Sequence, residues 1–348
     1  MRTVLITLFA VGAFAQTGTM TIRETSGSTQ TSRPITLGRP FKQGEFTGYP
    51  RPRINGITAT LWQADVKNRW DADGSVKFAI ISFHADLPAS ATIAVDFENT
   101  ANACHLGNLA TCQAAALDGT GMLALRSSGW AATIAITNGT TQTANARTMI
   151  GAGKYSYWLQ GPVVTQMIVR DLTSRTYHMG FASSVLGLGP MFLITGYPAY
   201  TAGIREEFVL ENMEADRLID QTYSLVVANS GGTVYSRASF THYGQARWHK
   251  GNEAAHIWDG TAPGSIEINH NREYLTSTKA IPNYDPDVPV TATTASQLVS
   301  YYAGCANQGI NFGDNICLFK AMGTAGGRPD IAFVMQHELR ALFSGSAS

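Results

Sequence analysis

Short runs of alternating apolar and polar residues recur along most of this chain. Clear examples are residues 59–66 (ATLWQADV), 76–87 (VKFAIISFHADL) and 93–97 (IAVDF). Gly, Pro and Asp turn signals separate such runs, and no long helical period interrupts them before about residue 291. A half-buried antiparallel strand has this pattern. We therefore predict a mainly β fold, in which a small β-barrel precedes a larger antiparallel β-sandwich.

Changes in the pattern set the expected domain boundaries. A cysteine-containing segment over 100–120 separates two groups of strands, and helical spacing appears at 295–303 and 331–343. The predicted order is a signal peptide over 1–15, a flexible lead-in over 16–33, a barrel domain over 34–113, a sandwich over 114–290 and a helical segment over 291–348. Because so little helix follows residue 290, we expect the chain to stop near the start of a helical domain.

The first residues have the features of an export signal. Arg2 precedes an apolar core over 4–11, and Ala13-Phe14-Ala15 fits a cleavage site. This predicts a secreted or periplasmic protein that begins at Gln16, the alternative being a buried first strand. The apolar run is too short to span a bilayer, so we expect no membrane span in the mature chain. The balance of 25 basic and 25 acidic residues gives no support to a nucleic-acid partner.

Four cysteines in an exported chain favour two disulfides. Cys104 and Cys112 enclose one short loop, and Cys305 and Cys317 enclose another. Local pairing is the simplest of the three connectivities that four cysteines allow. We expect the bridges Cys104–Cys112 and Cys305–Cys317.

Cations, imidazoles and aromatic rings are densest between residues 243 and 289. An arginine offers a fork of donors to a carboxylate, and an aromatic ring offers an apolar face, so these residue types suit an acidic sugar. The predicted substrate-binding residues are Arg247, Trp248, Lys250, Trp258, Arg272 and Tyr284, and the candidate catalytic residues are His249, Tyr243 and His270. In the alternative interpretation, Trp248 and Trp258 are core residues and the charges between them are solvated.

A lyase that acts on a uronic acid needs two kinds of group, and this stretch contains both. A cation neutralises the carboxylate, and a base removes the proton on C5. Residues two apart on a strand share a face, so Arg247 with His249, and His270 with Arg272, could act as pairs. The alternative is a structural histidine beside a solvated arginine.

Other motifs carry weaker signals. Asp71 and Asp73 lie in a DADGS segment that predicts a tight turn and lacks the spaced ligands of a calcium loop. We expect no cofactor and assign no metal ligands, although a divalent cation such as calcium stays open. Glu206 and Glu211 are an alternative pair of glycosidase carboxylates.

Three sets of residues resemble one family. They are 63–66 with 70–83, then 246–250 with 268–275 and 281–286, and finally GGRPDI at 326–331. In this order they are similar to exo-acting rhamnogalacturonan lyase-like exported bacterial proteins. The resemblance implies a RIFT-type barrel, a central β-sandwich and an α/α toroid, and it assigns no catalytic residue here.

Two functions follow as expectations. The first is the β front end of a polysaccharide lyase-like enzyme that acts on acidic, pectic glycans and that, as this fragment alone, is inactive. The second is a non-catalytic carbohydrate-binding or cell-surface structural module. In both, the expected partner is a polysaccharide or oligosaccharide, and the oligomeric state stays open.

Overall fold

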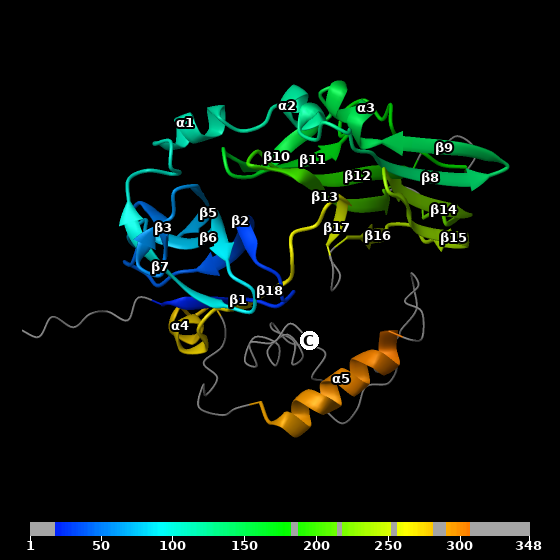
Figure 1. Cartoon of the computed structure of the whole chain (residues 1–348). Coiled ribbons are helices and arrows are strands. Elements are labelled where there is room, and N and C mark those ends of the chain that lie inside the picture. Colours follow the sequence, from blue (N-terminus) through cyan, green and yellow to red (C-terminus); the bar gives the residue numbers. More distant parts are fainter. Residues whose placement is uncertain (1–17, 182–186, 214–217, 252–255, 281–289, 307–348) are drawn as a thin grey trace, which may run out of the picture.

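The computed structural model describes residues 18–181, 187–213, 218–251, 256–280 and 290–306, and the account of the fold refers to these ranges (Figure 1). Their strands form four antiparallel sheets, and helices are few and mostly short. The mainly β prediction is confirmed.

The first unit consists of two facing sheets. One has the order β18-β1-β7-β3-β4, formed by Ile266–Asn269, Met20–Glu24, Thr92–Thr100, Tyr49–Ile54 and Ile57–Thr58; the other is β2-β6-β5, formed by Gln30–Pro40, Val76–Leu87 and Trp62–Arg69. Apolar residues that alternate along the strands fill one core between the sheets, among them Ile22, Ile81, Phe83 and Val95.

No ladder joins these two sheets within the described residues, so they do not form the closed barrel that the sequence predicted. Prolines explain part of the difference, because proline has no N–H to donate to a ladder. Pro34 and Pro40 lie on the edge strand β2. In β3, the carbonyl of Pro52 accepts from Ala59 on the side away from β7, so its missing donor also lies on that side.

Two segments lie elsewhere than the sequence had placed them. Most of the predicted lead-in is strand, because β1 pairs with both β7 and β18, and β2 begins at Gln30. Residues 266–269 were assigned to the sandwich, yet β18 pairs with β1, and the next helix, α4 (Arg272–Ser277), packs Tyr274 into the first core. The chain therefore returns to its first unit after building the second (Figure 1).

The second unit is a sandwich of two antiparallel sheets. The larger has the order β10-β11-β12-β13-β16, with β17 also paired to β13, and its strands are Tyr155–Gln160, Thr165–Arg170, Leu188–Tyr197, Tyr200–Asn212, Arg247–Lys250 and Ile257–Gly260. The smaller is β15-β14-β8-β9, formed by Gly232–His242, Gln221–Asn229, Ala132–Asn138 and Thr140–Asn145. Their facing side chains share one core that includes Ile134, Phe192, Phe208 and Phe240.

Short helices and turns finish the two units. Helices α1 (Leu109–Ala114), α2 (Gly119–Ala124) and α3 (Ala146–Gly151) begin after caps at Asn108, Asp118 and Asn145. The predicted Cys104–Cys112 disulfide is present beside α1. In the DADGS segment, the Asp73 carboxylate accepts from the amide and hydroxyl of Ser75, which is the hydrogen bonding of a tight turn.

Polar contacts fix the two units against each other. The side-chain oxygen of Gln63 on β5 accepts from the amides of Val163 and Val164 at 3.1 Å each. The Tyr197 hydroxyl of β12 donates to Thr36 of β2, and the Arg33 guanidinium of β2 donates to the carbonyl of Gly264. The large sheet of the sandwich therefore turns one edge of its outer face toward β2.

A longer helix, α5 (Ala292–Ala306), follows, as the spacing at 295–303 predicted. It is a single helix within the described residues and forms no toroid there. Three expectations lie outside the described residues: the signal peptide, the Cys305–Cys317 bridge and the helix at 331–343. Among the helices that the structure describes, none has the length and apolar character of a membrane span.

Candidate functional site

The strand β16 divides the predicted residues between two faces of the large sheet. Trp248 is 7% exposed and packs in the sandwich core against Tyr235 and Phe240. Arg247 and His249 point to the outer face, where they pair in register with Glu211 and Val209 of β13. Arg247 and His249 share one face of the strand, as their spacing predicted, whereas Trp248 has the structural role of the alternative interpretation.

Two glutamates of β13 bind the cations on this outer face. Glu211 forms ion pairs with Arg247 and Arg170, each at 2.8 Å. Glu207 accepts from Arg205 through one oxygen and lies 3.3 Å from His249 Nε2 through the other. The Glu207 side chain is only 8% exposed, but that of His249 is 37% exposed, so the imidazole can reach a ligand while its carboxylate partner stays covered.

The first unit contributes to the same place. Arg33 of β2 lies close enough to His256 to act on it electrostatically, as do Arg205 and Glu207. Burial is the main cause that lowers the pKa of His256, and repulsion from the two arginines adds to it. Burial also lowers the pKa of Arg33. Groups from both units therefore share one electrostatic environment.

Aromatic rings border these charges. Trp258 of β17 lies opposite Arg205 in the ladder, on the same outer face. Its ring stacks on Tyr197 with centroids 6.2 Å apart and meets Tyr200 edge-on at 6.1 Å. We call the group Arg33, Tyr200, Arg205, Glu207, His249, His256 and Trp258 the junction cluster.

The other predicted residues do not join the junction cluster. His270 and Arg272 belong to the first unit, because they follow β18. His270 is largely buried, and its Nδ1 has no hydrogen-bond partner among the described residues. Burial, with repulsion from Arg39, lowers the pKa of His270 from 6.5 to about 4. Such a group is a neutral structural histidine at pH 7, and the predicted pair of His270 and Arg272 adds nothing to the site on β16.

The remaining predicted residues lie elsewhere. Arg272 lines a shallow polar hollow of about 330 Å³ together with Thr19, Thr21, Asn269, Asn271 and Glu273. Tyr243 is 48% exposed in the turn before β16, and the Lys250 ammonium lies 5.9 Å from the Tyr235 ring, on the face of Trp248. Tyr284 lies outside the described residues.

The alternative pair Glu206 and Glu211 does not assemble. Residues five apart on one strand point to opposite faces, and Glu206 is completely buried on the inner face of β13. Burial raises the pKa of Glu206 to about 9, so this side chain is a neutral acid at pH 7.

Sequence reasoning missed Arg33, Arg205, Glu207 and His256. A signal for two of them was present, because Arg205, Glu207 and Glu211 stand at odd-numbered positions of β13, whereas the even-numbered positions hold Ile204, Phe208 and Leu210 besides Glu206. No local signal relates Arg33 to a strand more than 170 residues later. Within the described ranges, no three His, Cys, Asp or Glu side chains gather as metal ligands.

No protein-family model matches the chain, and the search of curated proteins finds no match.

Proposed function

We propose that this protein is an exported carbohydrate-active protein that binds acidic glycans at the junction cluster. One observation carries the proposal: forked cations, a solvent-accessible imidazole and a tryptophan ring lie side by side on the outer face of one sheet. A uronic acid needs donors for its carboxylate and an apolar surface for its ring.

Charge favours an anionic over a neutral sugar. On this part of the outer face, the arginines at 170, 205 and 247 outnumber the glutamates at 207 and 211, and Arg33 of the first unit adds a further cation near His256. The side chains of Arg205 and Arg247 are 20% and 58% exposed, so both guanidinium groups can contact solvent and ligand. The carboxylate of a ligand can therefore bind these guanidinium groups alongside Glu207 and Glu211, at little desolvation cost.

The pair of His249 and Glu207 supports a second candidate function, β-elimination. The covered Glu207 carboxylate orients the imidazole, and the imidazole then serves as the base that removes the C5 proton. The C4–C5 double bond forms as the C4–O bond breaks, and the departing sugar oxygen takes up a proton from solvent. Arg205, bound to the same carboxylate, is placed to neutralise the substrate's acid group. We propose with this activity the kinship to the rhamnogalacturonan lyase-like proteins that the sequence resemblance implies, in which a helical domain would follow residue 290. The alternative is a non-catalytic binding or cell-surface module.

Titration calorimetry on the mature chain tests the binding proposal. The ligands are a short oligogalacturonide and its fully methyl-esterified form, which has the same rings without the charge. We expect Arg205→Gln to weaken binding of the acidic ligand by about 1.5–3 kcal/mol, the value of hydrogen bonds to charged groups. Binding of the ester should change far less.

Arg23→Gln is the matched control, because Arg23 is an exposed arginine of β1 that is also bound to a glutamate. Equal effects of the two variants, or equal wild-type affinity for both ligands, would contradict the proposal. Absorbance from a new double bond then separates the two functions. A lyase forms this product and loses the activity in His249→Gln, whereas a binding module forms none.

A further inference from the structure

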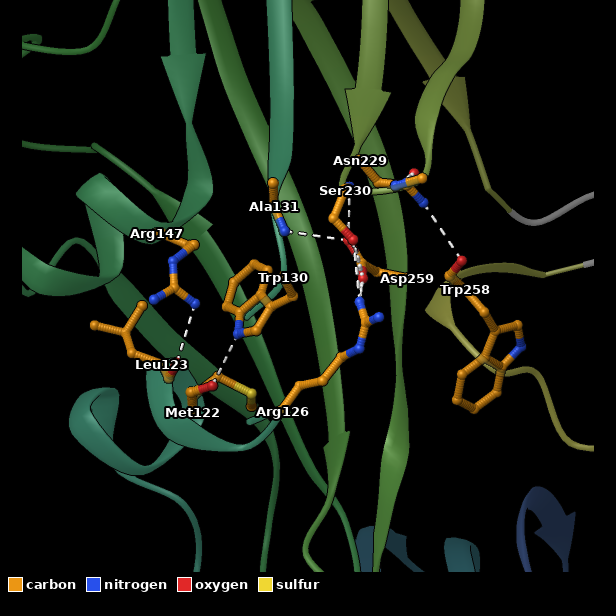
Figure 2. Close-up of polar contacts among 11 residues, drawn as sticks. Met122, Leu123, Arg126, Trp130, Ala131, Arg147, Asn229, Ser230, Trp258 and Asp259 are labelled. Atoms are coloured by element: carbon orange, nitrogen blue, oxygen red, sulfur yellow. Dashed lines mark hydrogen bonds and ion pairs between the residues drawn. The ribbon is translucent and has the colours of Figure 1, made fainter. Parts of the chain in front are cut away.

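A buried carboxylate follows Trp258 directly in the chain. Asp259 is completely buried on the inner face of β17. Its oxygens accept from the amide and hydroxyl of Ser230 at 2.8 and 2.5 Å and from the amide of Ala131 at 3.1 Å, and they form an ion pair with Arg126 (Figure 2). A carboxylate with this many partners is held in one orientation.

These partners come from two other parts of the sandwich. Arg126 and Ala131 lie in the connection from α2 to β8, and Ser230 lies in the turn between β14 and β15. Arg126 also donates to the Ser230 hydroxyl at 3.0 Å, which closes the network. Glu206, the nearby acid on the inner face of β13, is neutral at pH 7, so Asp259 is the charged partner of Arg126.

The strand β17 needs such an anchor, because its own ladder is small. It has four residues and pairs only with β13 among the described strands. Successive side chains of a strand point to opposite faces, so a fixed inward Asp259 fixes an outward Trp258. Asn229 adds a hydrogen bond to the Trp258 carbonyl at 3.4 Å, and Figure 2 shows the indole ring on the side away from Arg126.

A glycine of β13 near Trp258, Gly203, which pairs with Gly260, also permits this placement. A Cβ at Gly203 would lie 2.4 Å from the Thr261 carbonyl oxygen and 3.2 Å from the Trp258 ring. The glycine therefore lets β17 and its tryptophan approach β13 closely. In this position the ring stacks on Tyr197 and meets Tyr200 edge-on.

We propose that Asp259 is a positioning residue, whose bonds to Arg126, Ser230 and Ala131 hold β17 so that Trp258 presents its ring to a sugar at the junction cluster. The inference rests on the proposed function. Holding the ring before the ligand arrives removes an ordering cost from binding. The anchor affects stacking and not charge recognition, so it acts on acidic and neutral sugars alike.

Fluorine NMR of protein labelled with 5-fluorotryptophan tests this, because each of the 6 tryptophans gives its own resonance. Trp258→Phe identifies the resonance of Trp258. In Asp259→Asn we expect this resonance to move toward that of a solvated ring, while the resonances of Trp62, Trp70 and Trp158, which lie away from the Asp259 network, stay in place and report a folded protein. Calorimetry should show roughly tenfold weaker binding of both the oligogalacturonide and its methyl ester.

Ser230→Ala is the second variant, which removes the two hydrogen bonds of the Ser230 hydroxyl, to Asp259 and from Arg126, and keeps the ion pair. It should shift the Trp258 resonance in the same direction by less, and it decides the question if Asp259→Asn does not fold. An unmoved Trp258 resonance in the folded variants overturns the inference. Wild-type protein that binds neither glycan overturns the proposed function instead, and the resonance still tells whether Asp259 positions the ring.

Discussion

Residues 247–258 and 270–274 are neighbours in sequence and have similar side chains, but the structure uses them differently. In the first segment, Arg247 and His249 are exposed and each faces a glutamate. In the second, Tyr274 packs in the first core, and the partly buried His270 lies beside Arg39, a fully buried cation that donates to backbone carbonyls. Residue type alone therefore does not distinguish a recognition surface from a structural contact.

Burial and the kind of partner make the difference. The Arg39 guanidinium lies 4.5 Å from the Tyr274 ring centroid and 5.3 Å from that of Phe97, and it donates to the carbonyls of Gly18 and His270. These contacts join β2 to both ends of the described first unit. A cation that is enclosed in this way stabilises the fold and has nothing left for a ligand.

The largest expected effect comes from removing that cation. Arg39→Ala leaves two carbonyls without a donor and a cavity between two rings, and should lower the free energy of unfolding by about 3–5 kcal/mol. Urea denaturation measures it. The matched variant Arg247→Ala should cost under about 1 kcal/mol, because its ion pair is exposed. Equal losses in the two variants would erase the distinction between the segments.

The second prediction concerns pH. The pKa of His270 is about 4 in the folded protein and has its ordinary value of 6.5 in the unfolded chain, so the unfolded chain binds this proton more tightly. Its contribution to stability is complete above pH 6.5 and is lost as the pH falls toward 4. The loss should be about 2–3 kcal/mol.

His270→Asn isolates this effect from the other histidines. The difference in unfolding free energy between wild type and variant should shrink by that amount from pH 7 to pH 4, as measured by urea midpoints at several pH values. Parallel curves for the two proteins would mean that His270 titrates alike in both states.

The sequence predicted the strands well, because alternation is a local property. The runs at 59–66, 76–87 and 93–97 coincide with or overlap β5, β6 and β7, whose apolar side chains share one core. It could not predict that β18 pairs with β1, since two strands about 245 residues apart carry no local sign of their pairing. The same limit concealed the approach of Arg33 to β13.

Trp248 and Trp258 show a second limit of prediction from the sequence, which concerns the face of the sheet that each side chain occupies. Trp248 and Trp258 are an even number of residues apart, and one continuous strand would place them on the same face. The chain leaves β16 at Gly251, which has a φ of +135°, and resumes pairing with β13 in β17. A Cβ at this glycine would lie 2.8 Å from the Glu207 Cα. Because the strand is interrupted, the inward and outward alternation of side chains in β16 does not continue in phase into β17. Trp248 therefore lies in the sandwich core, and Trp258 lies on the outer face of the sheet.

The third prediction separates stability from recognition within the junction cluster. Glu207→Gln removes the anionic partner of both Arg205 and His249, and should lower the free energy of unfolding by about 1–3 kcal/mol. The same change frees Arg205 for a ligand carboxylate, so affinity for the oligogalacturonide should rise several-fold. Denaturation and calorimetry on one variant should thus give effects of opposite sign. A loss in both would show that Glu207 itself contacts the ligand.

The fourth prediction has the smallest expected effect and compares one arginine from each segment, Arg247 and Arg272. Arg247 is 58% exposed, and Glu211 pairs with both Arg247 and Arg170. Solvent and Glu211 therefore offset part of the positive charge that Arg247 offers to a ligand carboxylate. Arg247→Ala should weaken oligogalacturonide binding by about 1 kcal/mol, less than Arg205→Gln, because exposed pairs contribute little. Arg272→Ala, in the polar hollow of the first unit, should leave the affinity unchanged. Calorimetry in low and moderate salt checks both, since added salt should reduce the Arg247 effect further. A larger loss from Arg272→Ala than from Arg247→Ala would move the acidic-sugar site from the junction cluster to the first unit.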